Sequence, residues 1–175
     1  MPDLSAFGWD AAALVVALCA LYLTIKSNKV AHQHNRLSVM PRLSTTTASN
    51  MITEGAVRFL EVRVTLTNVG LGPAVVKKSE VLLDGNAMPV ESFDDVRPLL
   101  EQVFPGIQLG STYAFFKLNK KHALQVGKEV EIVAFQVLNP RADFDKEIKR
   151  FNLRISYESL YGDPLNYDSR DHLQP

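Results

Sequence analysis

The longest hydrophobic stretch in the chain is FGWDAAALVVALCALYLTI at residues 7–25, which contains a single charged residue, Asp10. An α-helix rises about 1.5 Å per residue, so roughly 20 apolar residues are needed to cross a bilayer core about 30 Å thick. Trp9 and Tyr22 lie near the two ends, where aromatic residues favour the membrane interface. The pattern predicts a transmembrane helix at 7–25, with Asp10 at headgroup depth.

The charges on either side of this segment predict its orientation. Residues 1–6 carry no Lys or Arg, and all 19 basic residues lie at or beyond Lys26. A cleaved signal peptide requires a basic leader, so we expect the segment to be retained. Lys26 and Lys29 begin a basic juxtamembrane helix or linker, residues 26–40, suited to anionic lipid headgroups. We expect a single-pass protein of the inner membrane, with residues 1–6 outside and the C-terminal part in the cytoplasm.

Beyond residue 40 the hydrophobic period changes from 3.6 to 2, which indicates strands that are buried on one face. The clearest examples are RFLEVRVTLTN at 58–68 and RFNLRISYES at 150–159. Weaker strand patterns begin at residues 42, 74, 111 and 129, and Gly, Pro and Asn clusters separate them.

Short strands separated by turns favour an antiparallel sandwich, because an α/β fold needs a helix after nearly every strand. We therefore predict a mainly β protein, in which the transmembrane helix precedes an immunoglobulin-like β-sandwich at 41–175. One or two short helical insertions are expected, at 91–104 and 119–126. Ser92 is placed to cap the first, and Pro98 is expected to disturb it.

Composition agrees with one tethered domain. About 150 residues follow the anchor, enough for one core. The lone Cys19 lies within the apolar run, which excludes an intrachain disulfide. Net charge is zero, and the sandwich portion is slightly acidic, so nucleic acid is not an expected partner.

Three fragments carry a resemblance: NRLSVMPRL at 35–43, LTNVGLGPAVV at 66–76 and ISYESLYGD at 155–163. Together they resemble a broad group of small, largely uncharacterised bacterial membrane proteins. The resemblance implies an N-terminal membrane helix followed by a sandwich domain, and it supplies no catalytic residues.

The most distinctive loop is the candidate site formed by Asn68, Gly70, Gly72 and Pro73. We interpret it as a strand connection in which the glycines supply positive φ and Pro73 fixes entry to the next strand. Glycine-rich backbone can also cradle a phosphate, but Gly72 is followed by Pro73 and not by the Lys-Ser/Thr pair of a Walker motif, so the loop is not a P-loop.

Catalytic and metal-binding patterns are weak. The acidic run RADFDKE at 141–147 lacks the spacing of a calcium loop, and a solvated charged hairpin is the simpler interpretation. The four histidines, at 32, 34, 122 and 172, are scattered without nearby Cys. We therefore expect neither an enzyme nor a cofactor.

Two functions remain open. The first is a membrane-tethered module that binds a protein partner through loops, an exposed aromatic patch or a strand edge. The second is a sensor that binds a small molecule in the sandwich and signals to a partner or through anchor oligomerisation. Small residues at 8 and 12, and at 13 and 17, have the spacing of helix-pairing motifs. Such spacing is common by chance in alanine-rich helices, so a homo-oligomer through the anchor is a hypothesis that crosslinking in membranes would test.

Overall fold

The computed structural model describes residues 4–104, 108–140 and 144–172, and the chain forms two compact units, Met1–Ser38 and Val39–Pro175. The described part of the first unit is one uninterrupted helix, α1 (Leu4–Ser38). In the described part of the chain, α1 is the one helix long and apolar enough to cross a membrane. Its apolar side chains between Leu14 and Ile25 are exposed, as expected of a helix that has no protein core to enter.

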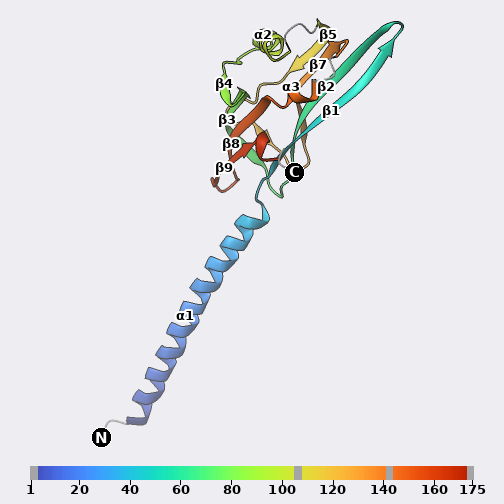
Figure 1. The fold of residues 1–175 in the computed structure, drawn as a ribbon. Coiled ribbons are helices and arrows are strands. Elements are labelled where there is room, and N and C mark those ends of the chain that lie inside the picture. The colour runs from blue at the N-terminus through green and yellow to red at the C-terminus, as the bar shows by residue number, and fades with distance from the viewer. Residues whose placement is uncertain (1–3, 105–107, 141–143, 173–175) are drawn as a thin grey trace. The chain divides into compact units, whose positions relative to one another are not determined.

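Two antiparallel sheets form the second unit (Figure 1). In the first sheet the strand order is β1 (Leu43–Glu54), β2 (Val57–Asn68), β7 (Glu129–Leu138), β5 (Gln108–Phe115). In the second the order is β4 (Asn86–Met88), β3 (Ala74–Leu83), β8 (Phe151–Glu158), β9 (Pro164–Asp168), and β6 (Ala123–Leu124) pairs with β3.

With β6 set aside, these orders correspond to the A-B-E-D and C′-C-F-G sheets of an immunoglobulin-type sandwich. The predicted fold class is therefore confirmed: the protein is mainly β, with an N-terminal apolar helix and antiparallel sheets.

The two clearest alternating sequences form central strands. In β2, Val62 and Leu66 are fully buried, and in β8, Leu153 and Ile155 are buried on the face toward the opposite sheet. The alternation correctly predicted which side chains enter the core, because residues two apart in a strand share a face.

Two separate buried clusters form the core of the sandwich. The first includes one face of α2 (Phe93–Val103), where apolar residues recur at helical spacing. The second lies around β3, β8 and the start of β1. The α2 residues of the first cluster are Val96, Leu99, Leu100 and Val103.

The insertions differ from expectation in two ways. Helix α2 continues through Pro98, so the predicted disturbance is wrong. Its start is stabilised by Asp95, whose carboxylate accepts hydrogen bonds from the backbone N–H groups of Glu91 and Ser92 at 2.9 and 2.8 Å. The 119–126 segment contains β6 rather than a helix.

Two short helical segments lie near the C-terminus. The charged segment predicted as a hairpin leads into α3 (Phe144–Ile148), although its residues 141–143 lie outside the described residues. A 3₁₀ turn, η1 (Ser169–His172), follows β9.

Candidate functional site

The predicted loop lies between β2 and β3, and Asn68 is its centre. This side chain is fully buried and makes four hydrogen bonds. Its Oδ1 accepts from the backbone N–H groups of Arg42 (3.2 Å) and Gly70 (3.1 Å). Its Nδ2 donates to the carbonyl groups of Gly72 (2.8 Å) and Leu124 (2.9 Å). Asn68 therefore joins the start of β1, its own loop and β6.

The role predicted for the glycines is wrong. Among the described residues, the glycines with positive φ are at 55, 85, 127 and 162, and neither Gly70 nor Gly72 is among them. Both are required instead by close backbone packing. A Cβ on Gly70 would lie 2.2 Å from the backbone nitrogen of Arg42, and one on Gly72 would lie 1.8 Å from the carbonyl oxygen of Val39. Pro73 directly precedes β3.

Backbone N–H groups of the loop are also occupied by hydrogen bonds within the domain. The N–H groups of Val69 and Leu71 donate to the carbonyls of Arg42 and Met40, at 2.8 and 2.9 Å. With the N–H of Gly70 bound to Asn68, three consecutive donors are occupied. This geometry fits a latch on residues 39–42 and does not fit a phosphate cradle.

The predicted membrane-interface residues all lie on α1. The side chains of Trp9 and Asp10 fall outside the described residues. Those of Tyr22, Lys26 and Lys29 are exposed.

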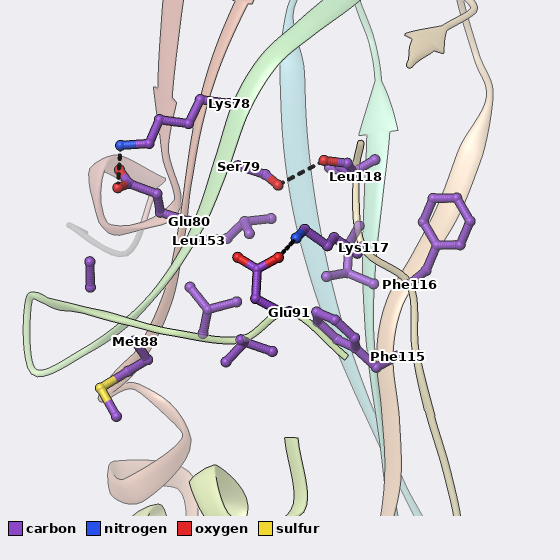
Figure 2. Close-up of a pocket in the computed structure, with 14 residues that line it drawn as sticks. Lys78, Ser79, Glu80, Met88, Glu91, Phe115, Phe116, Lys117, Leu118 and Leu153 are labelled. Atoms are coloured by element: carbon purple, nitrogen blue, oxygen red, sulfur yellow. Dashed lines mark hydrogen bonds and ion pairs between the residues drawn. The ribbon is translucent and has the colours of Figure 1, made fainter. Parts of the chain in front are cut away.

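A cleft of about 180 Å³ opens between the sheets beside β3 and β4 (Figure 2). Lys117 forms an ion pair with Glu91, and Lys78 pairs with Glu80 at 2.6 Å. The hydroxyl of Ser79 donates to the carbonyl of Leu118 at 2.9 Å. The cleft's charged groups are thus paired with one another, which leaves no excess charge directed at a ligand.

A second cavity, of about 320 Å³, lies where the two buried clusters fail to meet. Ile132 and Leu153 line both this cavity and the cleft of Figure 2. Its volume is at the lower end of the usual range for small-molecule sites, about 300–1,000 Å³. Its other lining residues come from β1, β2, β8, the α3 region and η1: Thr45, Thr47, Val64, Ile148, Lys149, Phe151 and Ser169.

Metal-binding clusters are also missing from the described residues, where no three His, Cys, Asp or Glu side chains gather in a suitable group. His122 instead packs edge-on against Phe116, with ring centroids 5.5 Å apart.

The edges of the two sheets differ sharply in protection. β4 and β6 are only 3 and 2 residues long, and β9 begins at a proline. α2 lies against β5, and the pairing of β5 with β7 is interrupted by a bulge. β1 is 12 residues long, and its register with β2 runs without a shift. Natural sheets usually shorten, bulge, charge or cover such edges. β1 has one charge, Glu54, at its far end.

Two tyrosines protect only the beginning of this edge. The carbonyl of Arg42 accepts a hydrogen bond from the backbone N–H of Val69, the residue directly after β2. The backbone groups of Arg42 therefore point toward the β2 side. Because this direction alternates along a strand, the backbone groups of Leu43 and of every second residue after it point away from β2. The backbone N–H of Leu43 bonds to the hydroxyl of Tyr157. Thr45 bonds to Tyr167 through its backbone N–H and through its hydroxyl, at 2.5 Å. Burial raises the pKa of both phenols, so both hydroxyls are protonated at neutral pH.

Beyond Thr45 the outer side of β1 is open. The side chains from Thr46 to Met51 are all exposed, and within the described chain β1 pairs with β2 alone. The outward backbone groups from this point belong to Thr47, Ser49, Met51 and Thr53. We call Thr46–Glu54 the free edge. Figure 1 shows that the hairpin of β1 and β2, which carries this edge, projects from the domain.

Sequence reasoning did not single out the free edge. The segment STTTASNMITE has few charges and no proline, a signal that could have indicated an unprotected strand. No protein-family model matches the chain, and no curated protein matches it in sequence.

Proposed function

We propose that this protein is a membrane-tethered, non-enzymatic interaction module that binds an extended protein segment along the free edge of β1. The observation that carries the proposal is the contrast within one strand. Tyrosine hydroxyls occupy the outward backbone donors at Leu43 and Thr45, whereas the next four outward positions face solvent.

Strand addition is a common mode of peptide recognition, in which main-chain hydrogen bonds supply affinity. The anchor α1 supports the proposal because tethering to a surface raises the local concentration of a partner in the same membrane. The basic residues after the apolar run favour a cytoplasmic domain at the inner membrane.

The latch around Asn68 also fits a tethered module. It fixes residues 39–42, where the chain enters the sandwich and β1 begins, to two other parts of the domain. The edge therefore starts from a rigid position, which lowers the entropy lost when a partner strand binds.

Ser49→Pro tests the proposal, because proline removes an outward N–H and leaves the hydrogen bonds of β1 to β2 in place. Ser49→Ala is the matched control, since it keeps that N–H. In full-length protein extracted from membranes under mild conditions, we expect Ser49→Pro to shift the native complex to the size of the single chain, and Ser49→Ala to retain the complex. An unchanged complex in a folded Ser49→Pro protein would contradict the proposal.

The second cavity favours one other candidate function, a small-molecule sensor. Its apolar wall and single cationic side chain, Lys149, suit a small ligand with an apolar body and an anionic group. Thr45 and Thr47 line the cavity from β1, so a bound ligand would touch the strand that carries the free edge.

Indole is a suitable apolar probe for this candidate. In the full chain in lipid nanodiscs, saturable shifts of the methyl NMR signals of Ile132 and Leu153, with no shift at Leu83 in the filled cluster, would support the sensor. Equal, unsaturable shifts at all three residues would contradict it.

A further inference from the structure

We propose that the segment that pairs with the free edge is the free edge of a second copy of this chain, in an antiparallel arrangement about Asn50. This inference rests on the proposed function and names the partner. It follows from the length, hydrogen-bonding phase and charge of Thr46–Glu54.

The length of the free edge fits a two-fold arrangement. It begins directly after Thr45, which Tyr167 caps, and ends at Glu54, where the turn to β2 begins. Centred on Asn50, antiparallel pairing places Thr46 opposite Glu54 of the second copy, so the paired segment uses every free residue. Beyond the paired segment, the residue before Thr46 is capped and the residue after Glu54 lies in the turn to β2.

The hydrogen-bonding phase also fits. Because outward backbone groups lie at odd-numbered residues, an antiparallel partner must place odd residues opposite odd residues. Pairing about Asn50 does so: Thr47 lies opposite Thr53, and Ser49 opposite Met51. Asn50 then faces itself in a pair without mutual backbone hydrogen bonds, where Cα atoms lie about 4.5 Å apart.

Charge favours a second copy over a charged peptide. Within the paired segment only Glu54 is charged. The two Glu54 residues of a pair are separated by eight residues of strand, or about 27 Å at about 3.4 Å per residue. That separation exceeds the Debye length of about 8 Å at physiological ionic strength, so their repulsion is screened. The facing pairs on either side of Asn50 combine a small side chain with a larger apolar one, Ser49 with Met51 and Ala48 with Ile52, and closed two-fold dimers are the commonest oligomers.

An engineered cysteine tests this geometry directly. Cys19 is the protein's own single cysteine, so Cys19→Ser provides a background without thiols. In that background, Asn50→Cys should form a disulfide-linked dimer in native membranes under mild oxidation, because disulfides require Cα atoms about 4.4–6.8 Å apart. Asn86→Cys is the matched control, since Asn86 is also an exposed strand asparagine but lies in the other sheet.

We expect Asn50→Cys to give the highest dimer yield of a cysteine scan from 47 to 53, and Ser49→Pro to reduce that yield to the level of Asn86→Cys. Equal yields at positions 50 and 86, or no dimer at any scanned position, would overturn the inference. If Ser49→Pro still dissolves the native complex while no scanned cysteine crosslinks, the partner is another protein: the inference fails and the interaction module stands.

Charge substitution gives an independent readout that leaves the backbone unchanged. Asn50→Lys places like charges opposite each other in a pair of identical chains, as does Asn50→Glu. In full-length chains labelled for energy transfer and reconstituted in lipid vesicles, we expect each variant alone to associate up to about fivefold more weakly. A mixture of the two should recover association, and a mixture no stronger than either alone would overturn the inference.

Discussion

Replacement of Asn68 probes the latch that fixes the entry to the sandwich. Asn68→Ala removes four hydrogen bonds and leaves the backbone groups of Arg42, Gly70, Gly72 and Leu124 without this partner. At about 0.5–1.5 kcal/mol net for each bond, the expected loss in free energy of unfolding is about 2–6 kcal/mol. That is a large share of the roughly 5–15 kcal/mol available to a typical domain.

Asn68→Asp separates hydrogen bonding from packing, because it keeps the shape and the acceptor but loses both donors. An ionised carboxylate would face the carbonyl oxygens of Gly72 and Leu124. Such a site favours the neutral acid and raises its pKa, so the variant should be least stable at neutral pH and recover as pH falls toward that pKa. Asn68→Ala should show no such recovery.

Thermal and denaturant unfolding of the full chain in nanodiscs, followed by near-ultraviolet circular dichroism, measures these differences. Trypsin cleavage after Arg42 should also accelerate in Asn68→Ala, because the latch that holds this backbone is lost. Asn166→Ala is the matched control, since Asn166 is exposed and its bond to Ser156 lies at the surface. A loss below about 0.5 kcal/mol in Asn68→Ala, or an equal loss in the control, would refute the reasoning.

Three further predictions concern other parts of the chain. A hydrogen bond from Arg170 lowers the pKa of Asp168 to about 2, so the stabilising contribution of Asp168 is present above pH 4 and is lost as pH falls toward 2. Over this pH range the melting temperature of Asp168→Asn should therefore fall less than that of the unmodified protein. Gly72→Ala should prevent normal folding, as read by circular dichroism, whereas Gly127→Ala, which has positive φ but open space, should cost about 1 kcal/mol. A reporter fused after Pro175 should be active in the cytoplasm, and activity on the opposite side would refute the predicted orientation.

The sequence predicted those parts of the fold that depend on local periodicity. The alternation in β2 and β8 identified Val62, Leu66, Leu153 and Ile155 as inward-facing, because strand geometry alone determines that pattern. The apolar run at 7–25 likewise predicted a helix, since its length and composition allow few other structures.

The candidate sites depend on contacts between distant residues, which one sequence does not reveal. Gly70 and Gly72 were correctly singled out, but their need for close packing arises from residues 39–42. Thr45 and Tyr167 are 122 residues apart, so the boundary between the capped and free parts of β1 follows only from the folded chain. Helix α2 passes through Pro98 because tertiary packing of its apolar face outweighs the local cost of proline.

Amide hydrogen exchange along β1 tests the central claim most directly, and the strand supplies its own control. Backbone groups at Ala48 and Asn50 point toward β2, whereas those at Thr47, Ser49 and Met51 point outward. In native membranes we predict slow exchange at both sets, because a partner strand protects the outward amides. In Ser49→Pro we predict rapid exchange at Thr47 and Met51 with Ala48 and Asn50 still protected. Rapid exchange at the outward amides of the unmodified protein in its membrane would contradict the account.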